Sequence, residues 1–205
     1  TALVGRHQTG TLTWRLTRPG GREEEPDAKG AREEAGRQEA CSGEVRQRAG
    51  RHVSRRSEIQ MTDDEVVAFL EEERIVTCAS LGKDGWPHLM PLWYVVRDGD
   101  VWAWTFAKSQ KVKNFERDDR ATIQVEAGDS YDQLRGVMFK CNVEIVRGIE
   151  SVLPLGLEIM SKYAGGELDE AGRGFVEAQA AKRVGLHFVP RESATWDHRK
   201  LGGGY

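Results

Sequence analysis

A cluster of cations at the start of a predicted helix is the feature of this sequence that most suggests chemistry. Ser109 follows a strand-like run and precedes residues 110–117, which are predicted to be helical, and serine is a favoured N-cap. The helix macrodipole favours acids at this end, but Lys108, Lys111 and Lys113 stand there instead. Cations beside the free N–H groups of a helix start form a pocket suited to a phosphate. The segment therefore predicts a phosphate site, and the alternative is a solvated charged helix whose lysines bind nothing.

No set of residues for hydrolysis or metal binding is recognisable in the sequence. The histidines lack metal-ligand spacing, and they are His7, His52, His88, His187 and His198. Asp197 and His198 are adjacent on a predicted strand, so their side chains point to opposite faces and cannot form a dyad. Glycine-rich phosphate loops and nucleophile-elbow motifs are absent as well. This pattern favours chemistry that is carried by a bound cofactor, which the protein orients and shields from water.

The elements that must position the lysines are predicted mainly as strands. The runs that alternate or are rich in β-branched residues are 74–81, 86–96, 101–106, 120–126, 136–146, 183–189 and 193–198. Helices are predicted at 62–73, which opens with a capping box of Thr62 and Glu65, and at 110–117, 153–163 and 171–182. We expect a mostly β fold, a small antiparallel β-barrel with added helices.

Two of the predicted strands carry apolar side chains on both faces. These residues are Trp86, Leu89, Met90, Leu92, Trp93, Tyr94 and Val95 in 86–96, and Val101, Trp102, Ala103, Trp104 and Phe106 in 101–106. A strand that is apolar on both faces is covered on both faces, and a barrel has only one interior. We therefore expect a second subunit or a planar ligand on the outside, and the alternative is cover by the helices predicted between 153 and 182.

Composition and charge exclude several classes of protein. The chain has 205 residues and a formal net charge of −3, so we expect no nucleic-acid or membrane partner. No apolar run approaches the ~20 residues that span a bilayer, and no charged-then-apolar leader opens the chain. Cys41, Cys78 and Cys141 are too widely spaced to indicate a disulfide framework or a zinc cluster. We expect a cytoplasmic protein, with Cys78 and Cys141 in its core.

Residues 1–60 differ in composition from the rest of the chain. The stretch 18–56 consists largely of Gly, Arg, Glu, Ala and Gln without periodicity, so it cannot bury enough apolar surface to offset the entropy of ordering. Met61 is followed at once by the capping box. We expect residues 1–60 to be a disordered extension, upstream of the domain or artefactual, and residues 61–205 to form one folded domain.

The order of these segments resembles the flavin-binding split-barrel family related to pyridoxamine 5′-phosphate oxidase. The shared pattern is a helix, a strand, a turn at Asp84-Gly85, a strand opening with Trp86-Pro87-His88, the strand 102–106, and Ser109-Gln110-Lys111. The segments 111–115, 117–121 and 196–201 are similar to the actinobacterial branch of coenzyme F-420 (deazaflavin)-dependent reductases. The resemblance covers nearly all of 61–205 and none of 1–60.

This resemblance implies a six-stranded split barrel that is usually a homodimer, with two cofactor sites at the subunit interface. Carried over by position, the cofactor-binding residues are His88, Met90, Pro91, Trp93, Trp104, Thr105, Ser109, Lys111, Lys113, Lys140, Trp196 and Lys200. Ser109 and Lys111 would hold the cofactor phosphate with help from Lys113, and the residues between 88 and 105 would line the ring. The lysine at 140 would reach across the dimer, and the two tail residues would close the site.

Departures from the oxidase pattern narrow the expected activity. The oxidase has a basic residue where this chain has His88, and Ser-Arg-Lys where this chain has Ser109-Gln110-Lys111; its C-terminal Arg-x-His substrate motif is missing here. Pyridoxamine phosphate oxidation is therefore not expected. The resemblance implies an oxidoreductase that transfers a hydride from coenzyme F-420 to a small organic acceptor, and His88 is the candidate proton donor. The alternatives are an FMN-dependent oxidase or reductase of the same fold, and a non-catalytic flavin- or haem-binding carrier.

Overall fold

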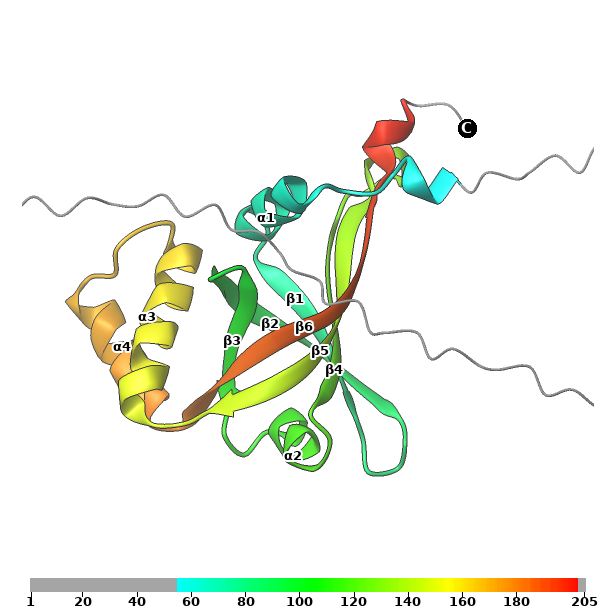
Figure 1. The fold of residues 1–205 in the computed structure, drawn as a ribbon. Helices are drawn as coiled ribbons and strands as arrows, with labels where there is room; N and C mark the ends of the chain where they lie inside the picture. Colours follow the sequence, from blue (N-terminus) through cyan, green and yellow to red (C-terminus); the bar gives the residue numbers. More distant parts are fainter. Residues whose placement is uncertain (1–54, 203–205) are drawn as a thin grey trace, which may run out of the picture. The chain divides into compact units, whose positions relative to one another are not determined.

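Six antiparallel strands close into a barrel in the computed structural model, which describes residues 55–202 (Figure 1). The strands are β1 (Ile75–Leu81), β2 (Pro87–Arg97), β3 (Asp100–Phe106), β4 (Arg120–Ala127), β5 (Arg135–Val146) and β6 (Arg183–Asp197). Their order around the barrel is β1-β2-β3-β6-β5-β4. The prediction of a mostly β, six-stranded antiparallel barrel with added helices is confirmed.

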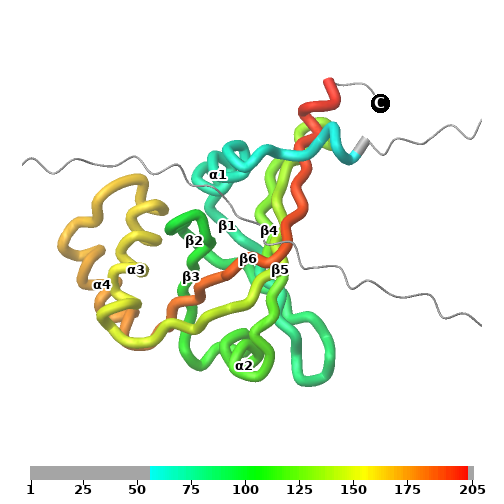
Figure 2. The backbone as a smooth tube through the Cα atoms, viewed as in Figure 1, coloured from blue at the N-terminus to red at the C-terminus, as the bar shows by residue number. Residues whose placement is uncertain are grey.

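Four helices surround the barrel: α1 (Asp63–Glu72), α2 (Gln110–Arg117), α3 (Ile149–Ala164) and α4 (Glu170–Ala180). The predicted capping box of α1 is present, with the Thr62 and Glu65 side chains each accepting from the other's backbone N–H. The tube view shows α1 and α2 at opposite ends of the barrel, and α3 and α4 together beside β2 and β3 (Figure 2). Single 3₁₀ turns lie at Arg55–Ser57, Tyr131–Gln133 and His198–Leu201.

The segment just before Met61 is hydrogen-bonded to the barrel. The Ile59 carbonyl accepts from Asp197 N–H at 2.7 Å, and Met61 N–H donates to Thr195 Oγ1 at 2.9 Å, so this segment is fastened to the end of β6. The rest of the predicted disordered extension, residues 1–54, lies outside the described residues, as do residues 203–205. No helix in the part of the chain that the structure describes is long and apolar enough to cross a membrane.

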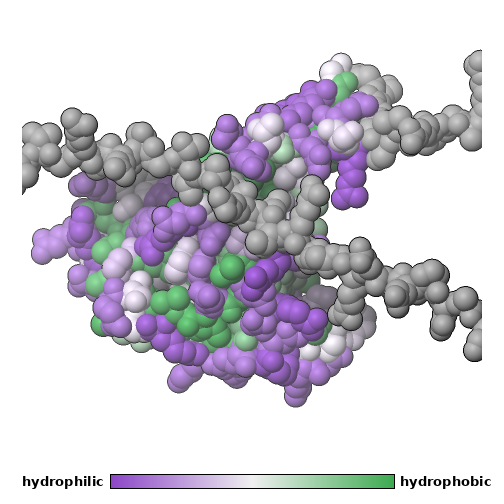
Figure 3. All heavy atoms as spheres, in the orientation of Figure 1, coloured by the Kyte–Doolittle hydropathy of each residue, from purple (hydrophilic) through white to green (hydrophobic). Residues whose placement is uncertain are grey.

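Two packed clusters account for the buried apolar side chains. The larger cluster fills the barrel and includes Phe69 of α1, Tyr94 of β2 and both predicted core cysteines, Cys78 and Cys141. The second cluster lies between the barrel and the helix pair, where Trp104 packs with residues of α3 and α4. On the face drawn in Figure 3, the surface is mostly hydrophilic, with a hydrophobic patch between these helices and the lower part of the barrel.

The helices α3 and α4 cover only part of the outer surface of β2 and β3. Trp104 and Val95 are buried beneath them, as the alternative interpretation of these two strands predicted. The first half of β2 and the neighbouring strand β1 remain uncovered in the single chain. Their exposed large apolar side chains are Ile75, Leu81, Leu89, Met90 and Trp93, and Trp86, just before β2, is exposed as well.

Two element boundaries differ from the sequence-based expectation. Residues 183–189 and 193–198 were expected to be separate strands, but β6 is continuous from Arg183 to Asp197. Its Pro190 lies opposite Cys141, where the pairing with β5 shifts register between Lys140 and Cys141, and a proline is tolerated at such an irregularity. Helix α3 begins at Ile149 rather than at residue 153, and Gly148 with φ of 98° precedes it.

Candidate functional site

The candidate site is a cleft that opens where β2 and β3 separate. These two strands pair with each other from Arg97↔Asp100 to Tyr94↔Ala103. Beyond that point, the described residues of β2 before Tyr94 and of β3 after Ala103 no longer pair with each other. The cleft has a volume of about 420 Å³ and is lined by Pro91, Leu92, Trp93, Trp104, Thr105, Met160, Phe175 and Arg183. Four of the predicted cofactor residues, those at 91, 93, 104 and 105, therefore lie together in it.

Lys111 of α2 lies next to this cleft, in contact with the cleft residue Thr105. Its Nζ donates to Thr105 Oγ1 at 3.1 Å, and only 7% of the residue is exposed. No carboxylate of the described residues forms an ion pair with it, although nearly every buried lysine in proteins has an acidic partner. Burial lowers the pKa of Lys111 from its usual value, and the charge of Arg183 acts in the same direction. An uncompensated cation therefore lies behind Thr105, one of the residues that line the cleft.

The start of α2 leaves polar groups free next to this lysine. Ser109 is the N-cap by backbone conformation, but its side chain makes no capping hydrogen bond and instead accepts from Thr105 Oγ1 at 3.5 Å. The first N–H groups of a helix have no intrahelical partner, so those of α2 remain available to an anion. Asn114 holds the helix in place by donating to Ser80 Oγ of β1 at 3.0 Å. Ser109, Thr105 and Lys111 thus lie together beside the start of α2, in an arrangement that could hold an oxyanion.

The side chains predicted to line the ring lie on two faces of β2. Pro91 and Trp93 point outward into the cleft, and the Trp93 ring stacks on Tyr163 of α3 at a centroid distance of 3.7 Å. His88 and Met90 alternate with them and share the face of Leu92 and Tyr94, which points toward the barrel interior. His88 Nδ1 is buried without a hydrogen-bond partner among the described residues. The structure therefore brings Pro91 and Trp93 together with Trp104, and it places His88 and Met90 on the other side of the strand.

Four further predicted residues, Lys113, Lys140, Trp196 and Lys200, lie away from this cleft in the single chain. Lys113 is exposed on α2, and Lys140 projects from β5, where its Nζ pairs with Glu192 at 2.7 Å. Trp196 lies at the far end of β6, close to Gly136, and Lys200 bonds to the Gln60 carbonyl and Glu65 at 2.6 Å each. These last two are near α1, at the end of the barrel opposite α2 (Figure 1).

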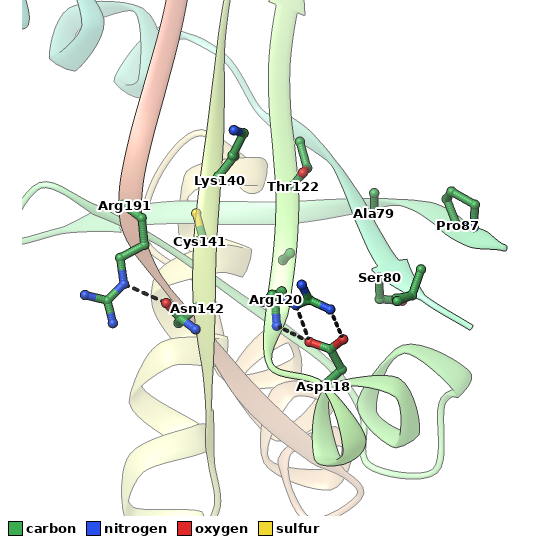
Figure 4. Close-up of a pocket in the computed structure, with 12 residues that line it drawn as sticks. Ala79, Ser80, Pro87, Asp118, Arg120, Thr122, Lys140, Cys141, Asn142 and Arg191 are labelled. Atoms are coloured by element: carbon green, nitrogen blue, oxygen red, sulfur yellow. Dashed lines mark hydrogen bonds and ion pairs between the residues drawn. The ribbon is translucent and has the colours of Figure 1, made fainter. Parts of the chain in front are cut away.

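A second cavity, of about 510 Å³, contains Lys140 and lies over β1, β4, β5 and β6 (Figure 4). Its cations already have partners: Arg120 forms two hydrogen bonds with Asp118 at 2.9 and 2.7 Å, and Arg191 donates to Asn142 at 2.6 Å. The Asp118 carboxyl has a pKa of about 2 because Arg120 hydrogen-bonds to it. This cavity is larger than the cleft, but two of its three cations, Arg120 and Lys140, have carboxylate partners, and the third, Arg191, is an exposed arginine that bonds to an amide oxygen; it is therefore the weaker candidate for an anionic cofactor.

Arg183 is the residue of the cleft that the sequence did not reveal. Its guanidinium carbon lies 4.3 Å from the Trp104 ring centroid and 4.2 Å from that of Phe106. This contact arises because β3 pairs with β6 across a separation of some 80 residues, with Phe106 opposite Arg183. In the sequence Arg183 is only the first residue of an alternating run, and no local signal distinguishes it from other surface arginines.

The residues of the cleft fit a flavin-type cofactor. The uncompensated Lys111, the free N–H groups of α2 and the hydroxyls beside them suit a phosphoryl group. Trp93 and Trp104 offer aromatic surfaces for a flat ring system. Burial raises the pKa of the Cys78 thiol to about 12, so this neighbour of Lys111 stays neutral and does not compensate the lysine.

Comparisons with known proteins agree with this geometry. Residues 62–197, more than half of the chain, match the model of the pyridoxamine 5′-phosphate oxidase family. The conserved hypothetical protein Rv2991 from Mycobacterium tuberculosis has 42% identity and a TM-score of 0.68, with 73% of this chain and 93% of that chain covered. No curated protein sequence matches the chain significantly.

Two more distant structures share the fold. An F-420 reductase has 22% identity and a TM-score of 0.51, covering 62% of this chain and 94% of that one. The FAD-binding protein mll6688 from Mesorhizobium loti has 18% identity and a TM-score of 0.50, covering 66% of this chain and 92% of that one. These two likenesses show that the fold is shared. On the family match, the confirmed split-barrel topology and the identity to Rv2991, the chain belongs to the pyridoxamine 5′-phosphate oxidase family.

Proposed function

We propose that this protein is an oxidoreductase that uses coenzyme F-420 to reduce a small organic acceptor. The observation that carries the proposal is Lys111, a buried cation without an acidic partner among the described residues, at the free start of α2 and next to an aromatic cleft. When bound, the deazaflavin would supply a hydride from its C5 carbon to an electron-poor carbon of the acceptor. The similarity of residues 111–121 and 196–201 to the F-420 branch supports this cofactor over FMN.

In the proposed complex, the residues at the start of α2 hold the cofactor phosphate. Lys111 neutralises its charge, and the hydroxyls of Ser109 and Thr105 donate to its oxygens. Lys113, exposed on the next turn, adds to the local positive potential. Trp93 and Trp104 flank the ring and exclude water from it. His88, the candidate proton donor from the sequence, lies on the other face of β2 from this cleft, so we do not assign it that role within one chain.

We propose that the protein acts as a homodimer and that the partner covers the exposed side of β1 and β2. The exposed apolar residues form cross-strand neighbours there, with Ile75 opposite Trp93 and Leu81 opposite Pro87. A contiguous apolar band of this kind is typical of an interface between subunits. The band meets the cleft at Trp93, so a second copy on it would also close the cleft. Lys140, which reaches no cleft residue of its own chain, would contribute to the partner's site.

Equilibrium binding of purified cofactors tests the proposal. We expect F-420 to bind with micromolar affinity and FMN to bind more weakly, and we expect Lys111→Ala to weaken F-420 binding by roughly 10- to 100-fold, the value of a charge-assisted hydrogen bond. Lys113→Ala, an exposed lysine of the same helix, is the comparison: it removes only a solvent-screened charge near the phosphate and should change the affinity by less than threefold or so. Tight FMN binding without F-420 binding would select the FMN alternative, and tight haemin binding alone would select the carrier.

A turnover assay completes the test of the proposed enzymatic role. Reduced F-420 is offered with quinone, enone and tetrapyrrole acceptors, and its oxidation is followed by absorbance. Oxidation that depends on both the protein and the acceptor supports a reductase. A protein that binds F-420 tightly but turns over none of the three acceptor classes would contradict the proposed enzymatic role.

A further inference from the structure

We propose that Arg183 binds the acidic group of the acceptor substrate, and that this acceptor is a flat conjugated molecule carrying a carboxylate. The inference rests on the proposed function, in which Lys111 and the start of α2 hold the cofactor phosphate. We assign the outer part of the cleft, next to Arg183, to the acceptor substrate.

Arg183 has the environment of a binding residue rather than of a structural ion pair. Its Nε is buried without a hydrogen-bond partner among the described residues, and none of the carboxylates in that part of the chain pairs with it. Contacts with the Trp104 and Phe106 rings hold the guanidinium in place through its face. Such contacts leave the N–H donors at the guanidinium edge available, in the geometry that matches a carboxylate.

Arg183 lines the cleft itself, whereas Lys111 lies behind Thr105. Successive side chains of a strand point to opposite faces, so Thr105 lies on the other face of β3 from Trp104 and Phe106. Lys111 contacts Thr105 on the inner face, whereas Arg183 contacts the two rings on the outer face. The two cations thus lie on opposite faces of one strand. A phosphoryl group held by Lys111, Ser109 and the start of α2 therefore leaves Arg183 for a different acidic group.

The walls around Arg183 favour a flat apolar molecule. Trp93 is fixed by its stacking on Tyr163, with an interplanar angle of 15°. Met160 of α3 and Phe175 of α4 line the same space, and Phe175 is 54% exposed. An aromatic side chain exposed beside a cleft can cover a ring that enters it. The outer cleft therefore combines aromatic surfaces with one fixed guanidinium.

Calorimetric titration with benzoate tests this site without cofactor or turnover. Benzamide is the neutral probe of the same shape. We expect benzoate to bind at least tenfold more tightly than benzamide, and we expect Arg183→Gln to weaken benzoate binding by roughly 10- to 100-fold while leaving benzamide unchanged. Arg191→Gln is the matched control, because Arg191 is an exposed arginine of the same strand that lines the other cavity. Equal binding of the two probes, or benzoate binding that is unaffected by Arg183→Gln, would overturn the proposal.

A second variant keeps the test informative if Arg183→Gln folds poorly. Phe175 is exposed, so Phe175→Ala should keep the melting temperature within about 2 °C and still weaken benzoate binding several-fold, with no effect on acetate. Unchanged benzoate affinity in Phe175→Ala would remove the aromatic wall from the proposed site.

Binding of F-420 to Arg183→Gln separates this inference from the proposed function. If Arg183 serves the acceptor, the variant should bind F-420 with wild-type affinity, and the KM for an acidic acceptor should rise at least tenfold. A large loss of F-420 affinity with unchanged benzoate binding would assign Arg183 to the cofactor's own acidic groups and overturn the inference. Failure of the wild-type protein to bind F-420 while benzoate binding follows Arg183 would instead reject the proposed cofactor and leave the anion site standing.

Discussion

Lys111 has a charge that the described part of the folded chain does not compensate. It is 7% exposed, and its hydrogen bond to Thr105 supplies an uncharged acceptor rather than a counter-ion. Removing an ammonium group from water without a partner costs free energy, and proteins retain such groups mainly where a ligand uses them. The uncompensated burial of Lys111 and the reversed charges of α2 in the sequence therefore both favour the proposal that this lysine binds an anionic ligand.

The protein without cofactor should become more stable when this lysine is replaced. Because burial lowers the folded-state pKa of Lys111 below 10.5, its value in the unfolded chain, the desolvation cost of the charged group opposes folding at pH values below that lowered pKa. Stability should rise as the pH increases from the lowered pKa to 10.5. We expect Lys111→Met to stabilise the apoprotein by about 1 kcal/mol or more at pH 7, which is roughly 2–4 °C in Tm, and to abolish this rise.

Thermal unfolding of the apoprotein between pH 7 and pH 10.5 measures both effects. Lys113→Met, on the exposed side of the same helix, should leave the Tm and its pH dependence unchanged. A lower Tm for Lys111→Met at pH 7 would show that the lysine is compensated in the folded state, and would weaken its assignment to a ligand.

At the level of elements, the cleft depends on how closely α3 approaches β3. Gly156 of α3 faces Trp104, and a Cβ at this position would lie 2.5 Å from the indole ring. The absence of a side chain at this point lets the helix pack against Trp104 and fixes the wall that this ring forms. The same helix supplies Met160 to the cleft and Tyr163 to the stack on Trp93.

Gly156→Ala should separate α3 from the barrel and loosen the cleft. Overpacking of this kind costs about 1–3 kcal/mol, and the displaced Trp104 should reduce the affinity for F-420 and for benzoate. Gly174→Ala is the matched control, because nothing lies within 4 Å of a Cβ at that position of α4. This control should be stabilised by roughly 0.5–1 kcal/mol through helix propensity. Urea unfolding measures the free energies, and equal effects of the two substitutions would contradict the close approach of α3.

At the level of the whole molecule, the single chain has an apolar band that a dimer would bury. Leu89 lies within it on the outer face of β2 and is 57% exposed. Leu89→Glu should give a folded monomer, because the charge faces solvent in the isolated chain but meets apolar surface in the proposed interface. Since the band adjoins the cleft at Trp93, F-420 affinity should also fall.

Sedimentation velocity at micromolar concentration, with F-420 binding measured on the same samples, checks this expectation. Ile149→Glu provides the control, because Ile149 is 50% exposed at the start of α3 and lies outside the band. That variant should remain dimeric. A wild-type protein that sediments as a monomer and binds F-420 fully would contradict the proposed assembly.

The sequence alone determined the features that depend on neighbouring residues. The alternation of Ala121, Ile123 and Val125 predicted the strand β4, and the pair Thr62 and Glu65 predicted the start of α1; both are confirmed. The lysines around Ser109 predicted the start of α2, which is confirmed, and an anion site, which stays a prediction. These predictions were possible because side-chain periodicity, capping and dipole charge act within a few residues of the chain.

Only the tertiary structure decided which distant residues meet. The pairing of β3 with β6 brings Arg183 to the rings of Trp104 and Phe106, and the separation of β2 from β3 opens the cleft beside them. The same register placed Trp196 and Lys200 at the end of the barrel opposite α2, and continued β6 through Pro190. Strand register across tens of residues is set by packing of the whole barrel, and therefore leaves no local trace in the sequence.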